Sequence, residues 1–186
     1  MIKKVIIITI LLLLNSCTSS NYLIGMNTPN IIHTKNIKKS IGISQIDIPE
    51  YLLSRKLAIS KGSKIEYKSD ALWIGEIDKR LQKEIINYIQ DRLPLSNIVE
   101  YPWSISKLPD INIKIIITKF ISNGKEVELK STYKIYNKRL DKQTIYHFNI
   151  KVKHQKDNEA VVKAMGMAFN KLSYDIYNKI NILFNY

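Results

Sequence analysis

The stretch INIKIIITKFI, residues 111–121, is the first of three β-rich runs that follow one another closely. The other two are VELKSTYKIY at 127–136 and QTIYHFNIKV at 143–152, and the segments between them, SNGKE and NKRLDK, are short. All three runs are rich in β-branched and aromatic residues, which favour strands. Because antiparallel neighbours need only short connections, the pattern predicts three strands joined in an antiparallel meander.

A helix is predicted on the C-terminal side of this meander. Asp157 or Asn158 can cap it, because both side chains accept hydrogen bonds from the free amides of a first turn. Its apolar residues recur every three or four positions and therefore share one face. They are Val161, Met165, Ala168, Leu172, Ile176, Ile180 and Leu183. One apolar face needs a partner, and the meander supplies a sheet against which it can pack.

A second helix is predicted on the N-terminal side of the meander. Asp70 is expected to cap it and Pro94 to end it. Its apolar residues recur every four positions: Trp73, Ile77, Leu81, Ile85 and Ile89. We expect Trp73 to lie in the core, because it falls on this apolar face.

A further strand is predicted at residues 41–48. Alternation would place Ile41, Ile43, Gln45 and Asp47 on one face, and the proline at position 49 would end the strand. Taken together, the segments predict an α+β fold. We expect a mixed, largely antiparallel sheet of about five strands packed with two amphipathic helices.

Residues 1–16 have the pattern of a bacterial export signal. Lys3 and Lys4 give it a positive start, residues 5–14 form an apolar run, and small polar residues follow. An apolar helix needs about twenty residues to span a bilayer, and this run is only half as long. The pattern therefore predicts a cleaved signal peptide.

Cys17 is the single cysteine of the chain, and the sequence LNSC that ends with it resembles the lipobox of bacterial lipoproteins. The resemblance implies that the Cys17 thiol receives a diacylglycerol and that cleavage leaves this residue at the mature N-terminus. A buried structural thiol is the alternative, but exported proteins normally pair or avoid cysteines. Thr18 stands where an aspartate would resemble an inner-membrane retention signal, so the expected location is the periplasmic face of the outer membrane.

The mature chain would hold about 170 residues, a length that suits a single domain. Residues 17–38 are polar and show little periodicity, so they are predicted to be a lipidated tether, in which Tyr22 and Leu23 could already contact the fold. A single α+β domain is predicted over residues 39–186. No cofactor is expected beyond the covalent lipid on Cys17.

The mature chain is strongly basic. Without residues 1–16 it keeps 27 basic and 16 acidic residues, a net charge of +11. The lysines are scattered through the chain, and export removes it from most nucleic acid, so no nucleic-acid partner is predicted. A weak attraction to anionic lipid headgroups is the one functional interpretation of the charge that we retain.

Several segments resemble the ABC-type transport auxiliary lipoproteins of the PqiC/YmbA type, in order and spacing. They are YL at 22, IGISQIDIPEYLLSRKLAI at 41–59, Trp73, VEYPW at 99–103, Phe120 followed by VELKSTYKI, and AMGMAFNKLSYDIYNKI near the C-terminus. The sequence departs from the family at YLLSRKL, where members more often have a tyrosine-leucine-aspartate-arginine run. Arg55 is therefore displaced by one position from the expected arginine.

The resemblance implies a non-enzymatic auxiliary component of an MCE/ABC-type intermembrane lipid transport system. Its partner would be an MCE-domain protein, its membrane contact a lipid anchor, and some relatives form closed rings of identical subunits. The alternative is an outer-membrane assembly lipoprotein of the LptE type, which acts as a structural plug or adaptor. The presence of MCE and permease genes beside this one would favour the first interpretation.

Catalysis and metal binding are not predicted. The histidines at positions 33, 147 and 154 have no metal-ligand spacing, and the last two would face opposite sides of one strand. Two Ser-x-x-Lys matches, at 104–107 and 131–134, are attributed to chance in a chain rich in both residue types. No set of nucleophile, base and orienting group is evident.

The predicted functional residues are those of a docking surface. Tyr51, Leu53 and Arg55 follow the strand-ending proline, and Trp103 lies in a second loop. Aromatic residues and arginine are favoured at protein interfaces. The alternative for Tyr51 is that it covers the end of the sheet.

Replacement of Cys17 by serine tests the predicted anchor, because a hydroxyl cannot form the thioether to diacylglycerol. The Cys17→Ser protein should incorporate no radiolabelled palmitate and should leave the membrane fraction. Membrane retention equal to that of the wild type would contradict the prediction.

Overall fold

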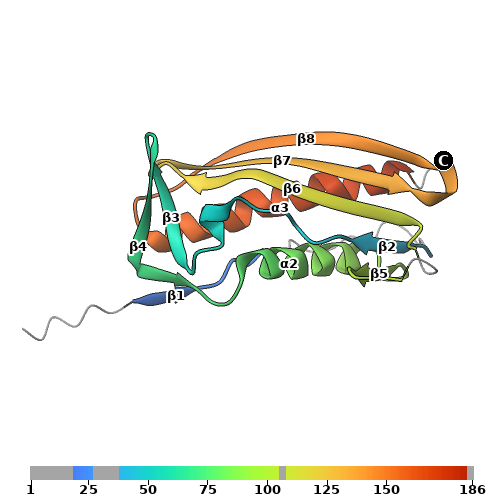
Figure 1. The fold of residues 1–186 in the computed structure, drawn as a ribbon, viewed down its shortest axis with the longest axis horizontal. Helices are drawn as coiled ribbons and strands as arrows, with labels where there is room; N and C mark the ends of the chain where they lie inside the picture. Colours follow the sequence, from blue (N-terminus) through green and yellow to red (C-terminus); the bar gives the residue numbers. More distant parts are fainter. Residues whose placement is uncertain (1–18, 27–37, 105–107, 184–186) are drawn as a thin grey trace, which may run out of the picture.

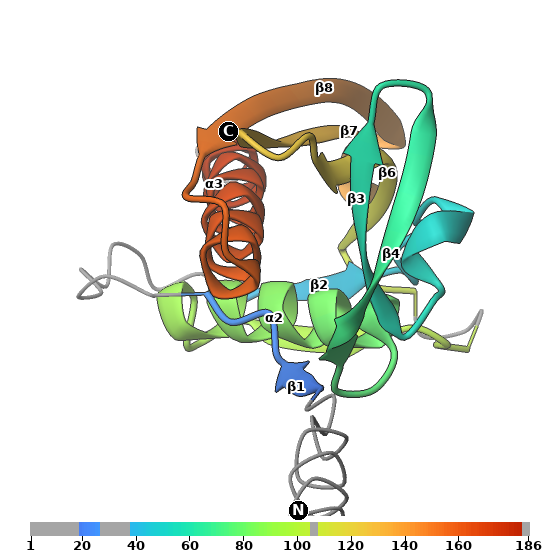
Figure 2. The same ribbon diagram turned by 90° about the vertical axis from the view of Figure 1, so that its left-hand side faces the viewer.

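The computed structural model describes residues 19–26, 38–104 and 108–183. In these ranges, eight strands form one mixed sheet that curves around two helices (Figures 1 and 2). The strands are β1 (Ser20–Tyr22), β2 (Ser40–Ile43), β3 (Lys56–Lys61), β4 (Lys64–Trp73), β5 (Asn97–Glu100), β6 (Ile111–Ser122), β7 (Glu126–Asn137) and β8 (Lys142–Lys153). The helices are α2 (Ile77–Arg92) and α3 (Asn158–Leu183). The α+β class is confirmed, but the expected number of strands, about five, was too low.

The antiparallel meander of β6, β7 and β8 is confirmed. Ile113 pairs with Ile135, and Tyr133 pairs with Tyr146 across the next ladder. The β6–β7 turn contains Gly124 with a φ of +87°, a left-handed conformation that glycine adopts without steric cost. The connection between β7 and β8 contains a short 3-10 helix, Lys138–Leu140.

Helix α3 packs against the concave face of this meander (Figure 2). Asp157 caps it, because its Oδ1 accepts a hydrogen bond of 2.6 Å from the backbone N–H of Ala160. The predicted apolar face is buried except for its last residue, which is half-buried. The Tyr133 hydroxyl donates a 2.5 Å hydrogen bond to Asp175 on α3. Burial, followed by this bond, raises the pKa of Tyr133, so the phenol stays neutral and holds β7 to the helix.

Parallel pairs explain why the sheet is mixed. The main order is β1-β4-β3-β6-β2-β5, and the meander continues from β6 to β7 and β8. Strand β2 lies parallel to β5 on one side and to β6 on the other. Strand β3 forms an antiparallel hairpin with β4 and meets β6 in parallel near Ser122.

The first helix begins later than predicted. Trp73 ends strand β4, Gly75 adopts a φ of +78°, and Glu76 is the N-cap residue of α2. Asp70 therefore lies in a strand and caps no helix, and its carboxylate instead accepts a hydrogen bond from the Asn158 side chain. Trp73 is buried, as expected, but from the sheet side of the core.

The strand predicted at 41–48 is also shorter than expected. Strand β2 ends at Ile43, and the alternation breaks after it, because Gln45 is exposed whereas Ile46 is buried. Asp47 still forms an isolated parallel bridge with Ile116. The chain therefore follows β6 along this segment without forming a regular strand.

The predicted tether is in part built into the domain. Strand β1 pairs in parallel with β4, and the Ile74 N–H donates a 2.9 Å hydrogen bond to the Tyr22 carbonyl. Residues 22–26, which we call the N-terminal strap, continue from β1 along α2. Ile24 is only 1% exposed, so the strap contributes to the core. The folded domain thus includes residues well before position 39, where the sequence predicted that it begins.

Charged side chains of α2 hold the strap. Arg80 Nε donates a 3.1 Å hydrogen bond to the Ile24 carbonyl, and Glu84 accepts one of 3.3 Å from the Met26 N–H. Arg80 and Glu84 also form an ion pair. Glu84 is largely buried, and a buried charge is costly unless it is paired. Here each of the two charges is compensated by the other and by a hydrogen bond to the backbone of the strap.

The strap crosses α3 at a point where both segments have a glycine, Gly25 in the strap and Gly166 in the helix. A Cβ atom at position 166 would collide with the carbonyl oxygen of Gly25. Beyond the crossing, the Ser173 hydroxyl contacts the Met26 sulfur at 3.6 Å. The strap therefore lies between α2 and α3, in contact with both.

Gly166→Ala tests this crossing, with Gly25→Ala as its matched control, because a Cβ at position 25 meets no atom within 4 Å. Overpacking typically costs about 1–3 kcal/mol. Alanine gains about 1 kcal/mol over glycine in a helix interior, so the loss measured will be smaller than the clash. We expect Gly166→Ala to lower the free energy of unfolding in urea and Gly25→Ala to leave it within about 0.5 kcal/mol. Equal stability of the two variants would contradict the crossing.

Candidate functional site

Tyr51 lies in a short 3-10 helix, η1 (Glu50–Leu52), and connects it to the sheet. Its hydroxyl accepts a 2.9 Å hydrogen bond from the Phe120 N–H in β6. This amide lies where β6 has passed the end of β2 and pairs with β3 only at Ser122, so the tyrosine satisfies an otherwise open edge position. Burial raises the pKa of the Tyr51 hydroxyl. Tyr51 thus positions the loop, while Leu53 and Arg55 face solvent.

Leu53 and Arg55 are exposed beside the first turn of α2. Leu53 is 65% exposed, which is high for a large aliphatic side chain. The Arg55 carbonyl accepts a 2.7 Å hydrogen bond from the Trp73 N–H, which fixes the backbone that carries the guanidinium. An open hollow separates this loop from α2. We call the residues around it the η1 surface: Leu52, Leu53, Ser54, Arg55, Gly75, Glu76, Ile77 and Asp78.

Trp103 lies on a different part of the molecule and covers strand β2. Its indole ring would lie 3.0 Å from a Cβ at position 42, so glycine is required beneath it. Tyr101 meets the indole edge-on, with ring centroids 5.4 Å apart. An open hollow beside β5 is lined by Trp103 and its neighbours. We call this the β5 surface: Ser40, Asn97, Val99, Glu100, Pro102, Trp103, Ser104, Leu108 and Pro109.

The structure brings Tyr51, Leu53 and Arg55 together but leaves Trp103 apart from them. The η1 surface includes the first turn of α2, whereas β5 follows the last turn of that helix (Figure 1). A helix of 16 residues is about 24 Å long. The predicted docking residues therefore form two surfaces at opposite ends of α2.

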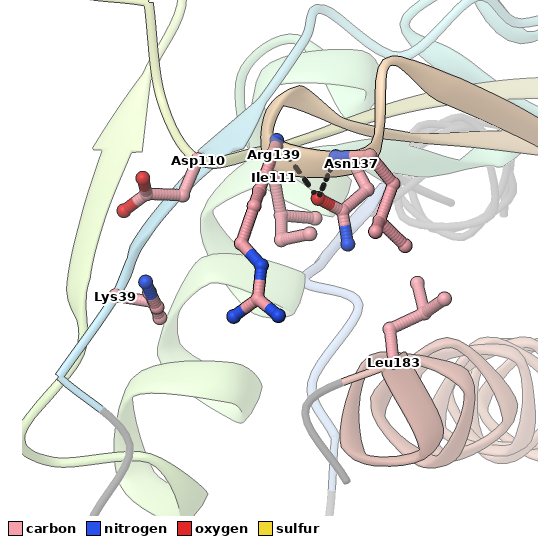
Figure 3. A pocket seen from close by; sticks show the side chains of 7 residues that line it. Lys39, Asp110, Ile111, Asn137, Arg139 and Leu183 are labelled. Atoms are coloured by element: carbon pink, nitrogen blue, oxygen red, sulfur yellow. Dashed lines mark hydrogen bonds between the residues drawn. The ribbon is translucent and has the colours of Figure 1, made fainter. Parts of the chain in front are cut away.

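A pocket that the sequence did not indicate lies near the C-terminal end of α3 (Figure 3). Its lining residues are Lys39, Asp110, Ile111, Asn137, Arg139, Leu140 and Leu183. The Asp110 carboxylate accepts hydrogen bonds of 2.9 Å from the N–H and the hydroxyl of Ser40, and these bonds lower its pKa. The Asn137 side chain is likewise committed to the backbone of the β7–β8 turn.

This pocket is small. Its cavity volume is about 90 Å³, whereas sites for small molecules usually measure about 300–1,000 Å³. Its polar groups mainly hold β2, β6 and the β7–β8 turn together. We therefore assign the pocket a structural role.

Two hydroxyl–imidazole contacts occur within the described ranges, Thr132 with His147 at 3.1 Å on the exposed strand surface and Ser122 with His154, and the second, shorter contact resembles a nucleophile and its base. His154 Nε2 lies 2.7 Å from the Ser122 hydroxyl, and Nδ1 donates to the Gln155 carbonyl. Ser122 is fully buried, and its oxygen also accepts a hydrogen bond from the Gly124 N–H. The group that orients the histidine is therefore a backbone carbonyl, and a substrate cannot reach the serine. The contact closes the β6–β7 turn against the chain that follows β8.

Comparison with known proteins identifies the family. The model of the ABC-type transport auxiliary lipoprotein component family matches residues 23–177. The chain belongs to this family. The match begins in the N-terminal strap and includes both the η1 and the β5 surfaces. A search of curated proteins finds no significant match.

Solved structures confirm the fold of this auxiliary lipoprotein. An uncharacterised protein superposes with a TM-score of 0.72 at 17% identity, with 88% of this chain and 99% of the other covered. A Xanthomonas campestris protein of the DUF330 family superposes with a TM-score of 0.69 at 11% identity, with 85% and 92% covered. At such identities the similarity establishes the fold alone.

Two further observations concern the described residues only. Within them, no three histidine, cysteine, aspartate or glutamate side chains are grouped so that they could hold a metal ion. None of the helices in these ranges has the length and apolar composition that crossing a membrane requires. Cys17 and the signal peptide predicted at 1–16 lie outside the residues that the structure describes.

Proposed function

We propose that this auxiliary lipoprotein is a non-enzymatic docking component of an MCE/ABC-type lipid transport system, anchored through Cys17 at the periplasmic face of the outer membrane. The family match over residues 23–177 is the observation that carries the proposal. The export signal and the lipobox support the anchor, because both precede the first residue of the matched domain. An MCE-domain protein is the proposed partner.

The chemistry of the described residues supports docking over catalysis. In the serine–histidine contact discussed above, the serine is fully buried and its hydroxyl is committed to a turn. By contrast, the η1 surface presents a largely exposed leucine and an arginine on a backbone that is fixed from both sides. Rigid presentation of such groups reduces the conformational entropy that binding costs.

We assign the η1 surface to the MCE-domain partner. Leu53 would be the apolar anchor and Arg55 its charged neighbour, a combination that interfaces favour. Tyr51 would act indirectly, by holding the loop against β6. The β5 surface, with Tyr101 and Trp103 side by side, would meet the neighbouring subunit of a ring around the partner.

Substitutions on the η1 surface test the proposal by co-purification with the MCE-domain protein from detergent-solubilised membranes. Leu53→Glu and Arg55→Ala should reduce recovery of the partner and leave the free energy of unfolding within about 0.5 kcal/mol of wild type, because both side chains are exposed. Leu140→Glu is the matched control, since Leu140 is similarly exposed at the β7–β8 turn. It should bind normally.

Tyr51→Phe separates positioning from contact. Loss of its hydroxyl leaves the Phe120 N–H without a hydrogen-bond acceptor, which should cost about 1–3 kcal/mol of stability.

Full recovery of the MCE-domain protein with Leu53→Glu and Arg55→Ala would refute the assignment of this surface. Crosslinking of Leu53 to an outer-membrane assembly barrel in place of an MCE-domain protein would favour the LptE-type alternative.

A further inference from the structure

We propose that the surface around the end of β1 and the β4–α2 turn rests directly against the membrane that holds the lipid anchor. This inference depends on the proposed acylation of Cys17. Its contact residues are Leu23 and Ile74, two large aliphatic side chains that are 44% and 54% exposed. We call these two residues the basal patch.

The length of chain between the anchor and the fold limits how far the domain can move from the membrane. Only Thr18 and Ser19 separate Cys17 from Ser20, the first residue of β1. Three residue steps span at most about 11 Å, even when the chain is fully extended. The segment that the sequence predicted as a tether of 22 residues therefore provides a much shorter connection.

Strand β1 cannot extend this connection without breaking the fold. Its three residues pair with β4, and the strap that follows is bonded to α2 and crosses Gly166 on α3. Figure 2 shows β1 at the margin of the molecule beside the end of β4, with α2 behind it. The surface next to β1 is therefore the part of the domain that the anchor holds closest to the lipid.

The basal patch lies at this place. The hydrogen bond from the Ile74 N–H to the Tyr22 carbonyl sets Ile74 beside Leu23. Both line one shallow hollow, whose floor contains the buried Ile24 and Trp73. Leu23 and Ile74 are thus two neighbouring, exposed aliphatic side chains that lie above buried core residues. Such a pair suits a contact with acyl chains and headgroups.

The charges around the patch indicate that the attraction is apolar. Near the start of α2, the acidic residues Glu76, Asp78 and Glu84 equal in number the basic residues Lys79, Arg80 and Lys83. Glu76 pairs with Lys79, and Glu84 pairs with Arg80. The first two turns of α2 therefore add no net charge beside the patch, and the contact should not require anionic lipid.

The test uses the full acylated protein in vesicles and an environment-sensitive fluorophore on a single introduced cysteine. Leu23→Cys and Ile74→Cys report on the basal patch. Ile145→Cys on β8 is the matched control, since Ile145 is similarly exposed and belongs to a strand distant in the sheet order from β1. Cys17 does not react with the fluorophore, because its sulfur is consumed by the lipid. Vesicles of pure phosphatidylcholine are compared with vesicles that contain phosphatidylglycerol.

The fluorophore at positions 23 and 74 should shift its emission to the blue and be quenched by nitroxide-labelled lipid, equally in both kinds of vesicle. At position 145 the fluorophore should keep the emission wavelength that it has in water and should not be quenched by the labelled lipid. Three results would overturn the inference: a water-like signal at positions 23 and 74, a contact limited to anionic vesicles, or a blue shift without quenching by lipid, which would indicate a second copy on the patch. Mass spectrometry of the N-terminal peptide keeps the two proposals apart. An acylated Cys17 with a water-like signal refutes the contact alone, whereas an unmodified Cys17 refutes the anchor as well.

Discussion

The close crossing of the strap over α3 is the constraint on which the arrangement of this domain depends. At Gly166 the helix has no side chain, so the backbone of Gly25 can lie directly on it. A larger residue would push the strap away and with it the buried Ile24 and the Arg80 and Glu84 contacts on α2. One missing side chain thus allows β1, α2 and α3 to form one packed unit.

This unit divides the molecule into parts with different roles. The meander and α3 form most of the core, where long strands and a 26-residue helix bury a continuous apolar face. The strap joins that core to the chain that leads to the proposed lipid anchor. The η1 and β5 surfaces lie at the two ends of α2. Under the proposed anchor, partners would have to meet the domain at the membrane, which agrees with the proposed docking role.

The long periodic segments could be predicted from the sequence, and the short ones could not. The meander and α3 each bury many residues at a constant period, so tertiary context reinforces the local pattern. Strands β1, β2 and β5 have three or four residues each, too few to show a period. The four-residue interval between Trp73 and Ile77 was accidental, since it joins the end of a strand to the start of a helix. Gly75 was the signal that could have separated them, because its left-handed backbone ends the strand.

The arrangement of the docking residues also could not be predicted from the local sequence. Exposure of Leu53 and Arg55 depends on the Tyr51 hydrogen bond to β6, a contact between residues 69 positions apart that no local pattern contains. Trp103 joined them in the prediction because both loops contain aromatic residues, but α2 separates the loops in space. The contact of Tyr22 with the fold was expected. The rest of the strap was missed because residues 24–26 have no regular period and because their partners, Arg80, Glu84 and Gly166, are distant in the sequence.

Hydrogen–deuterium exchange of the strap tests the central claim most directly. If residues 22–26 are an integral part of the domain, the Met26 amide, which donates to Glu84, and the amides of β1 that pair with β4 should exchange far more slowly than in an unfolded peptide. Their protection should be lost together with that of α2 as denaturant is added. Exchange of this segment at the rate of an unfolded peptide, while β6–β8 and both helices stay protected, would show that it is a free tether and would contradict the account.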